Sequence, residues 1–425
     1  MLELSTIRDQ FQDAVSGLLK RGISNAQDIL NDLLELDNQR RETQAEMDQV
    51  LAESNSKAKQ IGQMMKSGQY EQAESIKAET ASRKGRAKQR QQKLQGLITR
   101  QQQALYNIPN IPHAQVPVGS AAEDNLVMKE WGEFPKLHAK AKPHWDLIKE
   151  YDLIDFDLGN KISGAGFPFY KGMGAKLVRA LTSFCLDQAE AAGYYEIQPP
   201  LIVNEASGLA TGQLPDKEGQ MYAITDSEHY LIPTAEVPIT NIYRDTLMEQ
   251  KDLPIKNVGF TQCFRREAGS WGSDVRGLNR LHQFDKVEIV QVTHPDQSYA
   301  TLAEMCDHVS QLLQKLEVPY RVLNLCGGDL GFTAAQTFDF EVYAAGQQKW
   351  LEVSSVSNFE TYQANRLKLR CRGEGKKNFL LHTLNGSALA IPRLLAAILE
   401  NNQSESGIII PKALIPYTKF EMIHS

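Results

Sequence analysis

Cysteine is scarce in this sequence, with five residues among 425. The five are odd in number, widely separated and never paired as CxxC; they are Cys185, Cys263, Cys306, Cys326 and Cys371. Disulfide-stapled secreted domains and cysteine-based zinc sites both need closely spaced or paired cysteines. The pattern argues against both classes and predicts free thiols in a reducing compartment.

Long apolar runs are also missing. No stretch approaches the roughly 18 apolar residues of a membrane-spanning helix. The N-terminus, MLELSTIRDQFQ, is amphipathic and acidic, without the basic region and apolar core of a secretory signal. We therefore expect a cytoplasmic protein without a membrane partner. Its length, with 42% hydrophobic and 23% charged residues, is ordinary for a soluble protein of two or three domains.

Several familiar catalytic motifs are absent. The chain has no GxSxG elbow and no HExxH helix. Two glycine-rich segments, SGAGFPFYKG at 163–172 and CGGDLGF at 326–332, lack the GK[ST] ending of a P-loop and the strand–GxGxxG–helix context of a dinucleotide fold. We expect both segments to be loops around the active site.

Charge of one sign does not dominate, since the formal net charge is −6, and it does not indicate a nucleic-acid partner. The distribution is more informative. Residues 1–110 carry 16 basic and 14 acidic side chains, and residues 71–105 carry 8 and 3, whereas the remainder after residue 110 carries 30 and 38. The positive charge thus concentrates in one part of the N-terminal region.

The N-terminal region has the pattern of two long helices. Residues 24–67 contain no proline and a partly apolar heptad seam, made of Leu33, Leu36, Arg40, Thr43, Met47, Val50 and Ser54. KSGQ at 66–69 interrupts it, and a second seam runs through Ala73, Ile76, Ala87, Leu94 and Leu97 until NIPNIPH at 107–113. We predict an antiparallel helical hairpin roughly 65 Å long at 1.5 Å per residue.

Such a hairpin is often a structural or dimerising coiled coil. Here the seam is weak, and Gly62, Gly85 and Gly96 each cost up to about 1 kcal/mol relative to alanine. The run RKGRAKQRQQK at 83–93 holds six basic residues and no acid. A run of this kind is usually a solvated helix face, but it also suits binding to a phosphate backbone, which releases counterions without reading bases. Both interpretations remain open from the residues alone.

After a proline-bearing linker at 108–117, the pattern becomes mixed helix and strand. Residues 174–192 form an amphipathic pattern with Leu177, Leu181, Phe184 and Cys185 on one face, followed by a predicted strand at 194–203. Further strands are predicted at 229–232, 258–264, 286–292, 337–343 and 350–354. We therefore predict an α+β chain, in which the helical hairpin precedes a domain built on an antiparallel sheet flanked by helices.

Two segments, 264–288 and 384–403, each place an arginine where a strand meets a loop or helix. The planar fork of Arg265 suits phosphate and carboxylate oxygens, although a lone arginine is more often a surface ion-pair partner. Glu267, two residues on, would share a strand face with Arg265. Activation of a carboxylic acid by ATP needs such cations and alignment of the reactants, without a covalent nucleophile.

These segments resemble known motifs. Arg265, Glu267 and the HQF of 282–284 resemble motif 2 of class II aminoacyl-tRNA synthetases, and the GxxxxxPR spacing from Gly386 to Arg393 resembles motif 3. The helix–strand unit containing Pro199 and Pro200 is similar to motif 1, the dimer interface. The resemblance to bacterial-type seryl-tRNA synthetases extends over essentially the whole chain. It includes the sequence TAEVP at 234–238, the N-terminal hairpin and the sequence IIIPKALIPYTKF at 408–420.

The resemblance implies an ATP site and a magnesium site. Arg265 would contact the α-phosphate, Glu267 the adenine amino group and Arg393 the γ-phosphate, while Phe284, otherwise a typical core residue, would stack on adenine. The implied ATP-binding residues are Arg265, Arg266, Glu267, Leu281, Phe284, Glu352, Val353, Ser354, Ser355 and Arg393, with Arg265 and Arg393 catalytic. Glu352 and Ser355 would hold Mg²⁺, which prefers oxygen ligands.

The resemblance also implies where serine and tRNA bind. Short oxygen-bearing groups suit an ammonium and a small hydroxyl, and the implied serine-binding residues are Thr234, Ala235, Glu236, Arg265, Glu288, Asn385 and Ser387. The implied tRNA-binding residues are Arg83, Lys84, Arg86, Lys88, Arg90 and Lys93. In the loop of motif 2, SWGSDVRGLNR replaces the more usual GRDTRGLIR, which leaves Arg276 and Arg280 as candidates for the tRNA acceptor end.

The implied enzyme activates L-serine as seryl-adenylate and transfers it to the 3′ end of serine tRNA. Residues 1–110 would be the tRNA-binding arm and 111–425 the catalytic domain of a homodimer, in which one subunit's arm reaches tRNA charged by the other. Whether selenocysteine tRNA is also charged stays open. Two alternatives are an amino-acid activator with a non-tRNA acceptor and a coiled-coil adaptor with an inactive synthetase fold. The adaptor would need damaged motifs, but Arg265, Phe284, Glu352 and Arg393 are present.

Overall fold

The computed structural model describes residues 1–267 and 276–424, without the side chains of residues 78–86 and 376. The chain divides into two compact units. One contains Leu2–Leu19 and Ile23–Pro109, and we call it the arm; the other contains Met1, Lys20–Gly22 and the chain from Asn110 onward, and we call it the body. Within the described residues, no helix is both long and apolar enough to cross a membrane.

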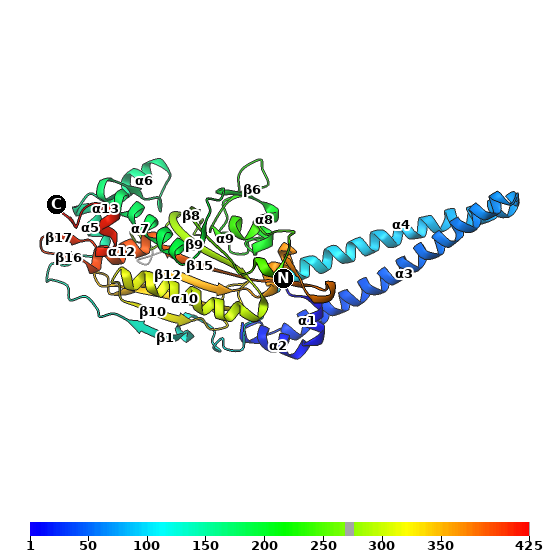
Figure 1. Cartoon of the computed structure of the whole chain (residues 1–425), viewed down its shortest axis with the longest axis horizontal. Coiled ribbons are helices and arrows are strands. Elements are labelled where there is room, and N and C mark those ends of the chain that lie inside the picture. Colours follow the sequence, from blue (N-terminus) through cyan, green and yellow to red (C-terminus); the bar gives the residue numbers. More distant parts are fainter. Residues whose placement is uncertain (268–275, 425) are drawn as a thin grey trace. The chain divides into compact units, whose positions relative to one another are not determined.

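The arm is an antiparallel hairpin of α3 (Ala26–Lys66) and α4 (Tyr70–Tyr106), preceded by the short helices α1 (Leu4–Asp9) and α2 (Phe11–Lys20) (Figure 1). The hairpin turns at Gly68, whose φ of +78° suits glycine. Every position of the two predicted seams is buried or partly buried, which confirms the heptad pattern. Helices α1 and α2 were not predicted individually, because each is too short to show a clear period.

Asp37 is a buried charge in the arm that the heptad pattern did not reveal. Its side chain has no exposed surface, and its carboxylate lies 2.5 Å from Arg8 Nη1 and 2.9 Å from Arg40 Nη2. Gln101 Nε2, on the opposite helix, donates to Asp37 Oδ1 at 3.0 Å. Burial alone would raise the pKa of Asp37, but the hydrogen bonds from Gln101 and Arg40 and the nearby guanidinium charges lower it. Asp37 thus ties α1, α3 and α4 together.

Replacing Asp37 with asparagine is expected to destabilise the arm by about 2 kcal/mol at neutral pH, because two partly buried arginines lose their anion. Because the folded-state pKa is lowered, the stabilisation is present above the usual carboxyl range and is lost as pH falls through that lowered pKa. Thermal unfolding followed by far-UV circular dichroism at neutral and acidic pH tests this. An unchanged difference between the two proteins across that range would contradict it.

The body contains an eight-stranded sheet in the order β1-β10-β11-β12-β15-β9-β8-β4. Its strands are β1 (Leu126–Trp131), β10 (Tyr320–Asn324), β11 (Gln336–Ala344), β12 (Lys349–Asn358), β15 (His382–Ala390), β9 (Gln283–Thr293), β8 (Ile255–Phe264) and β4 (Tyr195–Glu196). All neighbours are antiparallel except β4, which runs parallel to β8. The predicted antiparallel sheet is confirmed.

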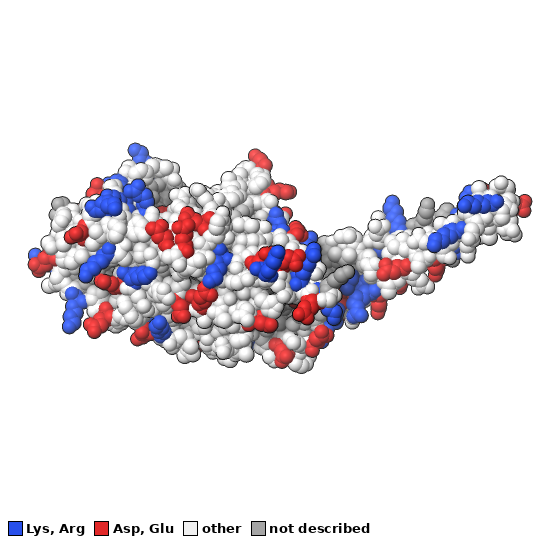
Figure 2. All heavy atoms as spheres, in the orientation of Figure 1, with Lys and Arg blue, Asp and Glu red and all other residues white. Residues whose placement is uncertain are grey.

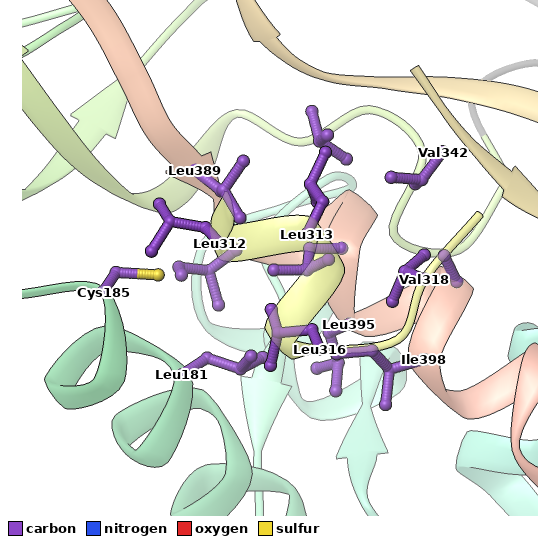
Figure 3. Packing of buried hydrophobic residues seen from close by; sticks show 14 of the residues in the cluster. Leu181, Cys185, Leu312, Leu313, Leu316, Val318, Val342, Leu389, Leu395 and Ile398 are labelled. Carbon is purple, nitrogen blue, oxygen red and sulfur yellow. The ribbon is translucent and has the colours of Figure 1, made fainter. Parts of the chain in front are cut away.

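Three helices pack on one face of this sheet: α7 (Gly172–Ala191), α10 (Ser298–Lys315) and α12 (Ile391–Asn401). Leu181 and Cys185 of α7, Leu312 and Leu313 of α10 and Leu395 of α12 meet in the core (Figure 3). Strand residues such as Val287, Ile289, Phe340 and Val342 join them from the sheet. Because strand side chains alternate between faces, the residues between these core positions point to the other face.

Shorter elements surround the sheet. The helices are α5 (His144–Glu150), α6 (Phe156–Ile162), α8 (Glu205–Thr211), α9 (Glu236–Asn241), α11 (Thr361–Leu367) and α13 (Ile415–Thr418). The strands are β2 (Ile154–Asp155), β3 (Phe169–Tyr170), β5 (Ile202–Asn204), β6 (His229–Leu231), β7 (Leu247–Met248), β13 (Arg370–Arg372), β14 (Asn378–Leu380), β16 (Gln403–Ser404), β17 (Gly407–Ile409) and β18 (Met422–Ile423).

Most predicted elements of the body are present, with two corrections. The strand predicted at 194–203 is wrong in its middle: only β4 and β5 form at its ends, since Pro199 and Pro200 have no N–H for a ladder. The segment 163–172 is also not wholly a loop, because it contains β3. The other glycine-rich segment, 326–332, is irregular as predicted, and Asp329 and Gly331 line the cavity described below.

Candidate functional site

The body holds a cavity of about 560 Å³, lined by strands β9, β11, β12 and β15 and by the segments at 213–220, 233–236, 278–281 and 329–334. The sequence-predicted ATP- and serine-binding residues line it, except Ala235 and Arg266. Ala235 is fully buried in a small apolar cluster with Ile239 and Val290. Residues predicted from four separate segments of the chain thus line one cavity.

Strand alternation explains why these residues meet. On β9, Val287 and Ile289 enter the core, whereas Glu288 between them faces the cavity. Glu288 lies opposite Ser387 in the ladder of β9 and β15, and Asn385 Nδ2 donates to Glu288 Oε1 at 2.6 Å. Glu288 lies in the middle of β9, which extends the strand predicted at 286–292 to Gln283 and Thr293.

One end of the cavity is a buried polar pocket around Glu288. Lys286 Nζ lies 2.5 Å from Glu288 Oε2 and donates to Thr234 Oγ1 at 2.9 Å. Lys286 was not predicted, although its place two residues before Glu288 on one strand face was a usable signal. The pocket therefore offers carboxylate, hydroxyl and amide groups to a small ligand, as its residue types had suggested.

Glu236 is the second carboxylate of this pocket. Gln363 Nε2 donates to its Oε1 at 2.5 Å. Burial and the charge of Glu288 raise the pKa of Glu236 to about 7, although Gln363, Lys286 and Arg265 oppose the shift. Two buried carboxylates facing one cavity favour a cationic ligand group, since an ammonium reduces the repulsion between them.

Arg265 also lines the cavity and lies immediately after the last residue of β8. Its Nε donates to Pro233 O at 3.3 Å, and its guanidinium carbon lies 5.2 Å from the centre of the Phe284 ring. The expectation that Glu267 shares a strand face with Arg265 is wrong, because β8 ends at Phe264 and Glu267 has a φ of +48°. The Glu267 carboxylate instead binds Arg280 Nε at 2.5 Å.

Arg393 enters the cavity from the first turn of α12, where Pro392 suits the start of a helix. Its Nε donates to Asn279 O and its Nη1 to Glu352 O, both at 2.9 Å. The side chain retains 30% of its exposure. Arg265, after β8, and Arg393, on α12, thus place two cationic side chains from distant parts of the sequence in the cavity lining.

Asp339 joins Glu352 and Ser355, the two residues predicted to hold Mg²⁺. Ser355 Oγ donates to Glu352 Oε1 at 3.4 Å, and Asp339 pairs with Ser355 across β11 and β12. Burial and the charge of Glu352 raise the pKa of Asp339 well above its usual range, against a hydrogen bond from Ser355. Among the described residues, Asp339 Oδ1 has no hydrogen-bond partner. Sequence reasoning missed Asp339 because only strand pairing brings it there.

The oxygens of Asp339, Glu352 and Ser355 suit a magnesium ion, which keeps other ligands, better than a metal ion that is held by protein side chains alone. In the part of the chain that is described, no group of three or more His, Cys, Asp or Glu residues is arranged to hold a metal. Mg²⁺ typically uses one or two carboxylates together with waters and substrate phosphates. An orphaned buried carboxylate oxygen beside Glu352 fits such an ion.

Comparison with known proteins agrees with this geometry. Residues 1–112 match the model of the seryl-tRNA synthetase N-terminal domain, and residues 222–402 match that of the tRNA synthetase class II core domain (G, H, P, S and T). The chain is 47% identical to the serine–tRNA ligase of Salinibacter ruber, over 100% of this chain and 99% of that protein. The chain belongs to the seryl-tRNA synthetase family.

Solved structures of the family share the fold. The crystal structure of seryl-tRNA synthetase from Pyrococcus horikoshii complexed with ATP has a TM-score of 0.92 and 34% identity, covering 100% of this chain and 99% of that one. Cytoplasmic serine–tRNA ligase from Naegleria fowleri in complex with AMP has a TM-score of 0.87 and 26% identity, with the same coverage. Seryl-tRNA synthetases therefore keep this architecture at modest sequence identity.

The predicted tRNA-binding residues are only partly within the described residues. The side chains of Arg83, Lys84 and Arg86 lie outside them. Lys88 and Lys93 are exposed on α4, and Arg90 pairs with Glu46 of α3 at 3.2 Å. Figure 2 shows Lys and Arg side chains along the visible face of the arm, interspersed with acidic ones.

The two candidates for the tRNA acceptor end, Arg276 and Arg280, follow the segment 268–275, which lies outside the described residues. The Arg276 guanidinium lies 4.7 Å from the centre of the Trp145 ring, and Arg280 pairs with Glu267.

Proposed function

We propose that this member of the seryl-tRNA synthetase family is a cytoplasmic serine–tRNA ligase. It uses ATP to convert L-serine to seryl-adenylate and transfers the seryl group to the 3′ end of serine tRNA. One observation carries the proposal: a single cavity joins the buried pocket of Glu288, Glu236 and Thr234 to the cations Arg265 and Arg393. An amino acid and a nucleotide can therefore react side by side.

In the first step, a serine carboxylate oxygen forms a bond to the α-phosphorus of ATP while the bond to pyrophosphate breaks. Arg265 lines the same cavity as the polar pocket and lies 5.2 Å from the centre of the Phe284 ring, so it can bind both the carboxylate and the α-phosphate. Phe284 and Arg393 enclose the adenine, and Arg393 also binds the γ-phosphate. Holding the reactants in line and stabilising the transferring phosphate supply most of the rate.

Serine is oriented by the buried pocket. The carboxylates of Glu236 and Glu288 attract its ammonium, while Thr234, Glu288 and Ser387 offer partners to its hydroxyl. Glu352 and Ser355, with Asp339 beside them, would hold Mg²⁺, which would supply positive charge to the phosphates. In the second step, a terminal ribose hydroxyl of tRNA attacks the seryl carbonyl carbon, and AMP leaves with the bonding electrons.

Pyrophosphate exchange with each of the twenty amino acids tests the proposal. We expect serine alone to support rapid exchange, which requires ATP and the amino acid but no tRNA. Aminoacylation of serine tRNA then tests the acceptor. Rapid exchange with serine but no charging of tRNA would support the alternative of a non-tRNA acceptor. The presence of the arm argues against that alternative.

We also propose a homodimer. In support, the motif 1 segment after α7 exposes apolar surface, including Tyr195 at 72% and Ile202 at 47%. In a dimer, one subunit's arm can reach tRNA charged by the other. Sedimentation of the purified protein at working concentrations tests the oligomeric state, and a persistent monomer with full aminoacylation would contradict it.

Neutralising the basic run of the arm is expected to weaken tRNA binding without affecting serine activation. Replacing Arg83, Lys84, Arg86 and Lys88 with glutamine removes up to four phosphate contacts, so the slope of log K against log salt should decrease by up to about 3 to 4. Pyrophosphate exchange should not change. A matched control replaces Lys57 and Lys59 of α3. Unaltered tRNA affinity and salt slope would identify the run as a solvated helix face.

A further inference from the structure

A buried polar network adjoins the cavity and was not predicted from the sequence. It joins His144, the first residue of α5, to Gln347 between β11 and β12 and to Glu400 of α12. The side chains of His144 and Glu400 have no exposed surface. Glu400 Oε1 accepts from the backbone N–H of His144 at 2.9 Å and lies 2.7 Å from its Nδ1. Glu400 Oε2 accepts from Gln347 N–H at 2.9 Å.

The other side of this network holds the backbone that lines the cavity. His144 Nε2 accepts from the Leu278 N–H at 2.9 Å. A backbone N–H can only donate, so Nε2 carries no proton, and the ring proton on Nδ1 is donated to Glu400. Gln347 Oε1 accepts from Asn279 Nδ2 at 3.0 Å. Leu278 and Asn279 both line the cavity.

Asn279 connects the network to Arg393. Its carbonyl oxygen accepts from Arg393 Nε at 2.9 Å. Arg393 and Glu400 are seven residues apart on α12, which places them on the same side of the helix, two turns apart. One helix therefore supplies both the arginine and the carboxylate that fixes the arginine's hydrogen-bond acceptor.

Close packing leaves this arrangement little freedom. A Cβ atom on Gly277 would lie 2.3 Å from His144 Nε2, and Gly277 has a φ of +66°. A Cβ atom on Gly346, next to Gln347, would lie 3.0 Å from Glu400 Oε2. The imidazole and the carboxylate thus fill the space between the cavity-lining segment and α12.

We propose that His144, Gln347 and Glu400 are positioning residues for ATP, which act by fixing residues 277–281 and, through the Asn279 carbonyl, the guanidinium of Arg393. The inference rests on the proposed function, in which Arg393 binds the nucleotide. None of the three residues lines the cavity. Replacing them should therefore lower kcat/KM for ATP without changing KM for serine, because the serine pocket is formed by β9, β15 and Thr234.

Replacing His144 with asparagine tests the network. Asparagine can still donate to Glu400 but does not reach Leu278, so we expect kcat/KM for ATP in pyrophosphate exchange to fall by about 10- to 100-fold. KM for serine should not change. Glu400→Gln is a second variant, which keeps the side-chain size and is expected to act in the same direction. His308→Asn is the control. His308 lies on α10 and is also mostly buried, but its ring packs against Tyr194 and not against the network.

A double-mutant cycle with Arg393→Lys separates positioning from a general structural role. Lysine keeps the charge but lacks the guanidinium Nε that bonds to Asn279, so His144→Asn should cause little further loss in that background. Equal losses in both backgrounds, or an equal rise in KM for serine, would overturn the positioning role. If Arg393→Lys alone left kcat/KM for ATP unchanged, the proposed role of Arg393 would fail as well.

Discussion

Replacing Arg265 with alanine is expected to reduce serine-dependent pyrophosphate exchange by about 10² to 10³-fold, because the α-phosphate loses a preorganised cation in the transition state. Arg265 lines the cavity that contains the buried polar pocket, and its guanidinium carbon lies 5.2 Å from the centre of the Phe284 ring. The loss should appear mainly in kcat, since the phosphorane-like transition state carries more negative charge on these oxygens than bound ATP does. Arg265→Lys should recover only part of the activity, because lysine lacks the bidentate fork.

The fold should survive this substitution, because among the described residues the Arg265 side chain makes a single hydrogen bond, from Nε to Pro233 O. Circular dichroism and the unfolding temperature check this point. Arg370→Ala, at an exposed position on β13, is a matched control and should keep normal exchange. Near-normal exchange by purified Arg265→Ala would show that another group neutralises the α-phosphate.

Alanine is expected to be activated at least about 10⁴-fold less efficiently than serine, measured as kcat/KM in pyrophosphate exchange. The residues around Glu288 are mostly buried; Asn385 Nδ2 donates to Glu288 Oε1 and Lys286 Nζ lies 2.5 Å from Oε2, yet Oε2 has no hydrogen-bond partner among the described residues. Alanine has a methyl group at the position of the serine hydroxyl, so it cannot form hydrogen bonds with these groups. Buried polar atoms then stay without a partner.

Threonine should be rejected less strongly than alanine. It keeps the hydroxyl and is opposed mainly by the room needed for one methyl group, which is worth only about 1 to 3 kcal/mol. Parallel measurements with serine, alanine and threonine give both ratios from one preparation. More efficient activation of alanine than of threonine would mean that the pocket selects by size and not by hydrogen bonds to the hydroxyl.

Much of the fold could be predicted from local patterns. The heptad seams of α3 and α4 follow from periodicity and from the absence of proline before Pro109. Strands β8, β9, β11 and β12 follow from runs of strand-forming residues. The prediction failed at 194–203, where an apolar run looked like one strand but Pro199 and Pro200 prevent continuous pairing. It also missed Asp37, because a charge inside a heptad pattern normally faces solvent.

The site was predictable where a motif carried it. Arg265, Phe284, Glu352 and Arg393 stand in segments whose residue types and spacing resemble those of a family. Lys286, Asp339, His144 and Glu400 were missed. Each of these acts through a partner from another element: Lys286 through Thr234, Asp339 beside Ser355, and His144 with Glu400. Apart from Lys286, whose place two residues before Glu288 was a usable signal, nothing in a single segment distinguishes these residues from ordinary charged residues of a strand or helix.

The sequence by itself determined the two-part plan, the long helices, the main strands and the kind of chemistry, because periodicity, proline positions and short motifs are properties of neighbouring residues. Only the tertiary structure decided which charges meet. Glu236 and Glu288 face one pocket, and Asp339 lies across from Ser355. Burial out of water, together with a neighbouring like charge, raises the pKa of Glu236 beside Glu288 and the pKa of Asp339 beside Glu352. Register and burial are set by the packing of distant elements, for which the local sequence carries no signal.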